Sequence, residues 1–220
     1  MTIRGIIDEI SDTYPHWDIV VIDDGSNDNT REEVQKTRAK LIPLLVNTKG
    51  VGTVLTAFLI AAKGKYDYLV KIDGDGQQEV SLLNLLVDAI KTNHADIAIG
   101  SRYVKKQQET DSFIKVIGRV TSSALINFKI RGKNKISDCT SGVRAWNADS
   151  IQILNKLYYK QPLAHDSVFW VREAVVASNN ALKIIEIPAF YHKRAHGKSK
   201  SFSPVNMIIF PLRLLGILIS

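Results

Sequence analysis

The stretch YLVKIDGDGQ, residues 68–77, places two carboxylates two residues apart directly after a short apolar run. The run Tyr68–Ile72 predicts a buried strand, and the glycines around the aspartates predict a turn at its end. Such a turn can bring Asp73 and Asp75 toward one cation. Carboxylate oxygens are the ligands that Mg²⁺ and Mn²⁺ prefer, and these ions in turn bridge diphosphate oxygens. The stretch therefore predicts a strand followed by a metal-binding turn.

A second acidic turn follows a second apolar run earlier in the chain. Residues 20–26 read VVIDDGS, at the end of a strand predicted over Asp18–Ile22. Open α/β sheets bind ligands at the carboxyl ends of their strands, so we expect both acidic turns at the same edge of one sheet. Two acidic strand ends in one sheet predict a site for a nucleotide diphosphate.

Helix-like and strand-like segments alternate along the first two thirds of the chain. Apolar residues at helical spacing predict helices over Thr2–Tyr14, Asp28–Arg38, Gly52–Ala62, Ser81–Asn93, Phe113–Phe128, Ile151–Leu157 and Ser167–Ala177. Short apolar runs predict strands over Asp18–Ile22, Leu41–Val46, Tyr68–Ile72, Asp96–Ile99 and Lys183–Tyr191. This order is typical of an α/β fold with a mostly parallel central sheet flanked by helices.

The composition excludes several classes of protein. With 220 residues, 45% hydrophobic and 23% charged, the chain can form a full core without disulfides. The single cysteine, Cys139, cannot form an internal disulfide, and no apolar leader precedes the first acidic residues, so we expect a cytoplasmic location. The net charge of +7 favours anionic partners. No nucleic-acid-binding motif accompanies it, so we expect no nucleic acid partner.

The chain divides into a domain over residues 1–203 and an apolar tail over residues 204–220. The tail is shorter than the roughly 20 apolar residues that a membrane-spanning helix needs. Four basic residues stand just upstream, namely Lys193, Arg194, Lys198 and Lys200. We expect the tail to form an interfacial helix at the cytosolic membrane face, where these residues meet anionic headgroups. A buried C-terminal helix is the alternative.

The two acidic turns belong to a series of six motifs along the chain. In order, the first four are Ile22–Asp28 (IDDGSND), Asn47–Gly52 (NTKGVG), Asp73–Gln77 (DGDGQ) and Gly100–Arg102 (GSR). In this order and spacing they resemble the family 2 glycosyltransferases with the GT-A fold. Two later motifs, Asp138–Arg144 (DCTSGVR) and Arg194–Lys200 (RAHGKSK), resemble the branch of that family that uses polyprenyl phosphates. The resemblance runs from about Asp18 to Lys200.

The resemblance implies a glycosyltransferase, and more closely an inverting hexosyltransferase. Its donor would be a nucleotide sugar, either GDP-mannose or a UDP-sugar, and its acceptor a polyprenyl phosphate, either dolichyl or undecaprenyl phosphate. It would require Mg²⁺ or Mn²⁺, associate with the membrane surface, and serve the synthesis of cell-envelope polysaccharide. A lipid phosphate is already an anionic nucleophile, so the reaction would need little help from a general base.

The resemblance also implies roles for individual residues. The residues implied at the nucleotide sugar donor are Asp24, Ser26, Lys49, Asp73 and Arg102. The residues implied at the metal are Asp73, Asp75 and Gln77. The residues implied at the acceptor phosphate are Arg119, Ser123, Arg194 and Lys200. The catalytic candidates are Asp75, Asp166 and Arg194. The basic residues suit this task because guanidinium and ammonium groups bind phosphate oxygens well.

One part of the family pattern is absent. The family begins with a strand that reads roughly Val-Val-Ile-Pro-x-Tyr-Asn-Glu, whereas Met1–Ile7 aligns with the helix that follows this strand. We therefore expect the first family strand to be missing, which would leave ladder hydrogen bonds unpaired and weaken nucleotide binding. A start codon placed too late, a fragment, and a chain whose sheet is completed otherwise are the three explanations.

Two other functions stay open. A transferase of the same fold that glycosylates a saccharide hydroxyl would need a general base, and Asp166 is the candidate for that role. An inactive sugar-nucleotide-binding or scaffold protein would bind the donor without turning it over.

Overall fold

A computed structural model describes residues 2–104, 113–130, 134–160 and 169–192 of the chain. In chain order the elements are α1 (Ile3–Thr13), β1 (Val20–Asp23), α2 (Thr30–Gln35), β2 (Lys40–Pro43), α3 (Val51–Gly64), β3 (Tyr68–Lys71), α4 (Ser81–Asn93), β4 (Ile97–Ser101), α5 (Phe113–Lys129), β5 (Arg144–Asn147), α6 (Ala148–Lys160), α7 (Phe169–Asn179) and β6 (Ile184–Pro188). Every predicted helix is present, and the predicted bounds of α4 match residue for residue.

The four-stranded sheet is mixed, because β5 runs against the other three strands, which share one direction. Its four strands follow the order β3-β5-β4-β6. β4 and β6 run parallel, but β5 lies between β3 and β4 and is antiparallel to both. The sequence prediction missed β5 altogether, because this strand has only four residues and begins with a charged one, Arg144.

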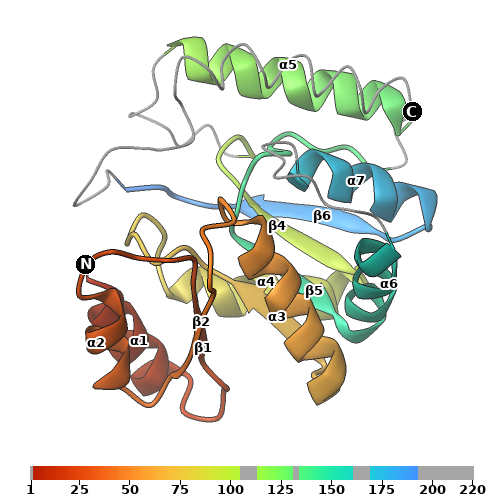
Figure 1. Cartoon of the computed structure of the whole chain (residues 1–220). Helices are drawn as coiled ribbons and strands as arrows, with labels where there is room; N and C mark the ends of the chain where they lie inside the picture. The colour runs from red at the N-terminus through yellow and green to blue at the C-terminus, as the bar shows by residue number, and fades with distance from the viewer. Residues whose placement is uncertain (1, 105–112, 131–133, 161–168, 193–220) are drawn as a thin grey trace.

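A second sheet holds only β1 and β2, which pair in parallel. Within the described ranges no ladder joins β1 to β3, so the strands divide into two separate sheets at this point. This division contradicts the expectation that both acidic turns follow strands of one sheet, since β1 precedes the first turn and β3 precedes the second. β1 and β2 lie together with α1 and α2 on one side of the molecule (Figure 1).

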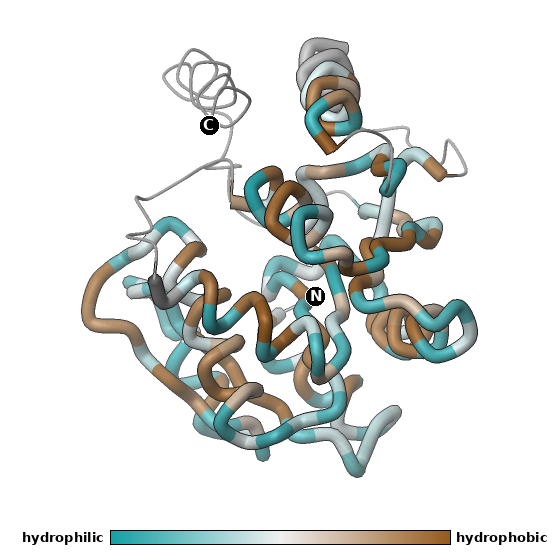
Figure 2. Tube along the Cα trace, turned by 90° about the vertical axis from the view of Figure 1, so that its right-hand side faces the viewer, coloured by the Kyte–Doolittle hydropathy of each residue, from teal (hydrophilic) through white to brown (hydrophobic). Residues whose placement is uncertain are grey.

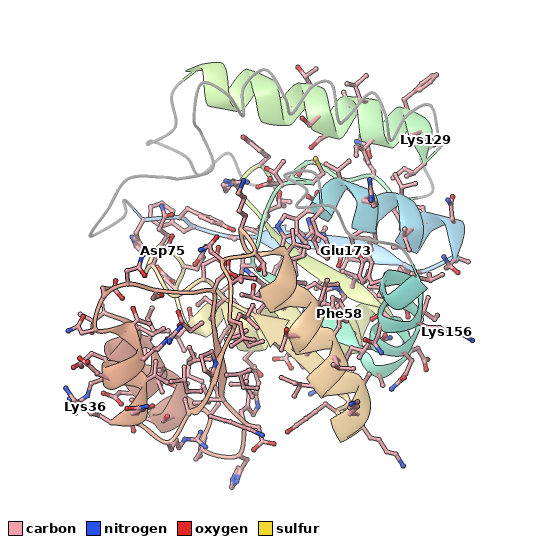
Figure 3. All side chains as sticks on the ribbon, viewed as in Figure 1. Lys36, Phe58, Asp75, Lys129, Lys156 and Glu173 are labelled. Atoms are coloured by element: carbon pink, nitrogen blue, oxygen red, sulfur yellow. The ribbon has the colours of Figure 1, made fainter. Side chains whose placement is uncertain are left out.

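The core has two layers of side chains, one on each face of the four-stranded sheet. Along β4, Ile97 and Ile99 face a cluster formed with α3, α6 and α7, whereas Ala98 faces α4. Alternation of this kind follows from the pleat of a strand, which sends successive side chains to opposite faces. Phe58 of α3, labelled in Figure 3, is completely buried in the first cluster. The domain is therefore a three-layer α/β/α structure.

The described helices carry both apolar and polar residues along their length (Figure 2), as expected for helices that cover a sheet. α1 has three buried residues on one face, Ile6, Ile7 and Ile10, and part of this face packs against Val80 and Leu83 at the start of α4. Among the helices that the structure describes, none is both long and apolar enough to cross a membrane. The predicted tail over residues 204–220, with its boundary at residue 203, lies outside the described ranges.

Candidate active site

The loop after β3 carries the two predicted metal ligands. β3 ends at Lys71, and the chain then turns through Gly76, whose φ of 70° is in the left-handed region that favours glycine. Asp75 Oδ1 accepts a hydrogen bond of 3.1 Å from the backbone N–H of Gln77. Asp73 forms an ion pair with Lys71, and its side chain is 45% exposed. Asp75, labelled in Figure 3, lies on the loop between β3 and α4. Both carboxylates therefore sit on one tight loop at the end of a strand.

A second segment packs directly against this loop. Lys71 Nζ donates a hydrogen bond of 3.1 Å to the carbonyl oxygen of Gly142, in the predicted motif Asp138–Arg144. A Cβ atom on Gly142 would lie 3.2 Å from Asp73 Oδ2 and 3.4 Å from Lys71 Nζ. A side chain at this position would therefore crowd the ion pair, and Asp73 would have to shift by a few tenths of an ångström.

The chain that enters the basic motif is fastened to the same acidic loop. The backbone N–H of His192 donates to the carbonyl oxygen of Gln77 at 2.8 Å, and Gln77 Nε2 donates to the carbonyl oxygen of His192 at 3.1 Å. His192 Nε2 also lies 3.2 Å from Glu79 Oε1. One residue earlier, Tyr191 is half-buried and its hydroxyl lies 2.8 Å from Ser141 Oγ. We call these contacts of Tyr191 and His192 the 191–192 anchor.

The loop after β1 holds the second pair of aspartates, and both are engaged by backbone groups. Asp24 Oδ1 accepts from the backbone N–H and the hydroxyl of Thr48, at 2.7 and 2.6 Å. Asp24 Oδ2 accepts from the backbone N–H of Gly50 at 2.8 Å. Asp24 therefore shapes the loop before α3, and its contact with a nucleoside stays a prediction.

The neighbouring carboxylate, Asp23, is buried. It accepts a hydrogen bond of 2.9 Å from the N–H of Ser26 and pairs with Arg31. Burial acts to raise the pKa of Asp23, but the bonds from Ser26 and Arg31 outweigh it and hold this pKa below its ordinary value. Ser26 thus lies at the tip of this loop, and Lys49 lies exposed on the loop before α3. Their contacts with a donor stay predictions.

Arg102 faces the protein interior. Its side chain is 8% exposed and forms two hydrogen bonds with Asp138, Nε to Oδ2 at 2.6 Å and Nη2 to Oδ1 at 2.7 Å. The guanidinium also lies 4.9 Å from the ring centre of Tyr191. Burial acts to lower the pKa of Arg102, but the hydrogen bonds and charge of Asp138 raise it above its ordinary value. Arg102 therefore fixes the 138–142 segment, and we leave it out of the proposed phosphate ligands.

The predicted acceptor residues on α5 differ in what the structure describes. Ser123 is 4% exposed, and its hydroxyl donates to the carbonyl oxygen of Ser137 at 2.9 Å and accepts from the N–H of Cys139 at 3.3 Å. It holds α5 against the 137–139 segment, so we leave it out of the phosphate ligands as well. Arg119 lies in α5, with its side chain outside the described part. Asp166, Arg194 and Lys200 also lie outside the described residues.

A buried charge pair supports the segment that carries Gly142. Arg144 and Glu173 form an ion pair in which both side chains are 0% exposed. Arg144 also donates to the carbonyl oxygens of Ser141 and Cys139, at 2.8 and 2.9 Å. Trp146 Nε1 donates to the second oxygen of Glu173 at 2.8 Å. Burial raises the pKa of Glu173, although the charge of Arg144 acts in the opposite direction.

The acidic loop fits a divalent cation bound together with a diphosphate. The described residues contain no group of three or more His, Cys, Asp or Glu side chains that could hold a metal alone. Mg²⁺ is commonly bound by one or two carboxylates, with substrate phosphates and water completing its coordination. Asp73 and Asp75 supply two such hard oxygen ligands, and the missing side chain of Gly142 leaves room beside Asp73 Oδ2. The residues present therefore suit Mg²⁺ or Mn²⁺.

The sequence analysis missed three residues of the site. Lys71 lies in the stretch YLVKIDGDGQ, where the pattern indicates only that it belongs to a strand. Gly142 is one position of the motif Asp138–Arg144, and the motif alone does not indicate that it contacts the acidic loop. The third, His192, stands two residues before the basic motif. A lysine that ends an apolar strand two residues before an aspartate was the available signal for Lys71, because such a lysine can reach back to that carboxylate.

Comparison with known proteins assigns this arrangement to a family. The family model described as glycosyl transferase family 2 matches residues 2–152. The dolichol-phosphate mannosyltransferase of Pyrococcus furiosus is 30% identical over 192 residues, which are 84% of this chain and 51% of that protein. The polyprenol monophosphomannose synthase of Mycolicibacterium smegmatis is 27% identical over 220 residues, 96% of this chain and 81% of that protein. The chain thus spans about half the length of the first relative.

Solved structures share the fold. Glucosyl-3-phosphoglycerate synthase from Mycobacterium tuberculosis, in complex with Mn²⁺, UDP and phosphoglyceric acid, gives a TM-score of 0.64 at 15% identity, over 99% of this chain and 72% of that one. At this identity the likeness concerns the fold, which confirms the predicted GT-A architecture. The family model covers well over half of the chain and includes both acidic loops. The chain therefore belongs to glycosyl transferase family 2.

Proposed function

We propose that this protein is a metal-dependent, inverting glycosyltransferase that moves a hexose from a nucleotide sugar to a polyprenyl phosphate. The observation that carries the proposal is the 191–192 anchor, which ties the acidic loop to His192, two residues before the basic motif Arg194–Lys200. Arg194 follows His192 by two residues, a stretch of at most about 7 Å. A site that binds two anionic substrates needs this combination of a cation on carboxylates and nearby basic side chains.

In the proposed reaction an oxygen of the lipid phosphate forms a bond to the anomeric carbon of the hexose. The bond between that carbon and the diphosphate oxygen breaks, and its electron pair leaves with the nucleoside diphosphate. Attack from the opposite face inverts the anomeric centre, and no proton moves because the acceptor phosphate is ionised. Asp73 and Asp75 would hold a divalent cation, which neutralises the charge that develops on the leaving diphosphate. Arg194 and Lys200 would bind and orient the acceptor phosphate.

The names of the relatives support the acceptor class. Two are the dolichol-phosphate mannosyltransferase and the polyprenol monophosphomannose synthase described above, and a third is an undecaprenyl-phosphate mannosyltransferase of Micrococcus luteus. A dodecaprenyl-phosphate galacturonate synthase is also similar, at 25% identity, so the sugar varies while the acceptor class stays the same. We therefore propose a polyprenyl phosphate acceptor and leave the choice between GDP-mannose and a UDP-sugar to experiment.

The proposed acceptor implies contact with a membrane surface. The basic residues between Lys193 and Lys200 suit anionic lipid headgroups as well as the acceptor phosphate. We propose a peripheral location at the cytosolic membrane face, with the apolar stretch 204–220 in contact with lipid.

The test is a donor screen on purified protein. Labelled GDP-mannose, UDP-glucose and UDP-N-acetylhexosamine are each incubated with undecaprenyl or dolichyl phosphate in detergent, with Mn²⁺, Mg²⁺ or EDTA. We expect transfer with one donor, loss of transfer in EDTA, and a fall of about 100-fold or more for Asp75→Asn. The matched control is Asp88→Asn, since Asp88 is exposed on α4 and accepts a hydrogen bond from Asn84 one turn away.

Other results would point elsewhere. Transfer to a saccharide hydroxyl that disappears in Asp166→Asn would contradict a phosphate acceptor and indicate a general base. Calorimetric binding of a donor without transfer to any acceptor would contradict an enzyme and indicate a sugar-nucleotide-binding protein.

A further inference from the structure

Lys71 is held in the site by three separate contacts. Its ammonium pairs with Asp73, donates to the carbonyl oxygen of Gly142 at 3.1 Å, and lies 5.5 Å from the ring centre of Trp170. The side chain is only 20% exposed. A surface lysine that merely samples a nearby carboxylate would not be enclosed in this way, since exposed ion pairs constrain their side chains weakly.

Among the described residues, Asp73 is the carboxylate that forms an ion pair with Lys71. Arg144 stands opposite Lys71 in the β3–β5 ladder, but Glu173 already neutralises it. The positive charge of Lys71 therefore acts on the carboxylate that is proposed to hold the cation. A divalent ion that approaches Asp73 therefore meets the positive charge of Lys71 beside that carboxylate.

We infer that Lys71 is an internal counter-ion that makes binding of the metal depend on the donor diphosphate. The inference rests on the proposed function, because it assigns the cation to Asp73 and Asp75. Without nucleotide, the lysine charge repels the incoming cation and competes for Asp73. With nucleotide, the diphosphate oxygens add negative charge beside the ion and outweigh that repulsion. Lys71 is thus a positioning residue that allows the metal to bind firmly only when the donor is present.

The test measures Mn²⁺ binding by calorimetry, with no nucleotide and with saturating GDP or UDP. Lys71→Met removes the charge, and Lys71→Gln removes it while keeping a donor for the Gly142 carbonyl. Both should bind Mn²⁺ without nucleotide roughly tenfold more tightly than the original protein, as expected for removal of one unit charge near a divalent ion. Both should also lose most of the gain in affinity that the nucleotide provides.

Two control variants separate the local charge from other effects. Lys71→Arg keeps the charge and should bind Mn²⁺ like the original protein. Lys91→Met removes an equal charge at the other end of β3, where Lys91 lies 5.3 Å from the ring centre of Tyr68, and it should also leave Mn²⁺ binding unchanged. Urea unfolding of each variant establishes that it is folded.

Three results would overturn the inference. In the first, Lys71→Met and Lys71→Gln bind Mn²⁺ with the affinity of the original protein, and nucleotide still raises the affinity of all three proteins. Lys71 would then not be the counter-ion, although the proposed metal site would be supported. If Lys91→Met has the same effect as Lys71→Met, only the net charge matters. If the original protein does not bind Mn²⁺ even with nucleotide, and Asp75→Asn changes nothing, the proposed metal site fails together with the inference.

Discussion

Replacing Glu173 by alanine should remove a large part of the stability of the domain. Glu173 and Arg144 are both completely buried, and the carboxylate also accepts from Trp146 Nε1 at 2.8 Å. The substitution leaves a guanidinium charge in the core without its partner, at a cost of about 3–5 kcal/mol. The indole N–H loses its acceptor as well, which costs about 1–3 kcal/mol, although the two effects overlap.

We therefore expect Glu173→Ala to lower the free energy of unfolding by about 4 kcal/mol, a large share of the roughly 5–15 kcal/mol typical of a domain. The assay is urea unfolding at pH 7, followed by circular dichroism and by fluorescence of the three tryptophans. The control is Glu33→Ala, which removes an exposed ion pair with Lys36 and should cost less than about 1 kcal/mol.

A double variant tests the cause. Arg144→Met with Glu173→Leu removes both charges together, so most of the lost stability should return. Transferase activity should not return with it, because Arg144 also binds the carbonyl oxygens of Ser141 and Cys139, in the segment that leads to Gly142. A cost below about 1 kcal/mol for Glu173→Ala, as for an exposed pair, would refute the reasoning.

Three further outcomes are expected. Gly142→Ala should slow transfer about tenfold with little change in the urea midpoint, because the new Cβ would lie 3.2 Å from Asp73 Oδ2; unchanged transfer would speak against close packing there. Burial raises the pKa of Cys139 to about 11, so a thiol reagent at pH 8 should label it only after unfolding, and fast labelling of the native protein would contradict its burial. Asp23 has a lowered pKa despite its burial, so its stabilising contribution is present above its unfolded pKa near 4 and is lost as the pH falls through the folded value. In Asp23→Asn the free energy of unfolding should therefore fall less steeply as the pH is lowered, as measured by urea unfolding at a series of pH values. An equally steep fall in the variant would contradict a stabilising role for the ionised Asp23 carboxylate.

Local sequence patterns were sufficient to predict most of the elements. The helix Ser81–Asn93 was predicted at its true bounds because its apolar residues repeat at helical spacing and bury one face. The strand β5 was missed because its place depends on distant partners. It pairs with β3 about 75 residues earlier in the chain and with β4 about 50 residues earlier, and such pairing leaves no local signal in four residues.

The site was predictable in part for the same reason. The acidic loop follows a readable strand, so Asp73 and Asp75 could be identified as a pair. The surroundings of Arg102 were not readable, because its partner Asp138 lies 36 residues away and turns a candidate phosphate ligand into a buried support. A basic residue in a motif does not reveal whether it faces a substrate or a carboxylate of its own protein.

The division of the strands into two sheets has a consequence for how the molecule opens. β4 is buried along its whole length and has a partner on each edge, whereas β1 is paired only with β2 among the described strands. Amide hydrogens of β1 and β2 should then exchange with solvent through a local opening, while those of β4 exchange only when the whole domain unfolds. A donor molecule that touches both acidic loops would join these two units, so its binding would slow exchange in β1 and β2 more than in β4.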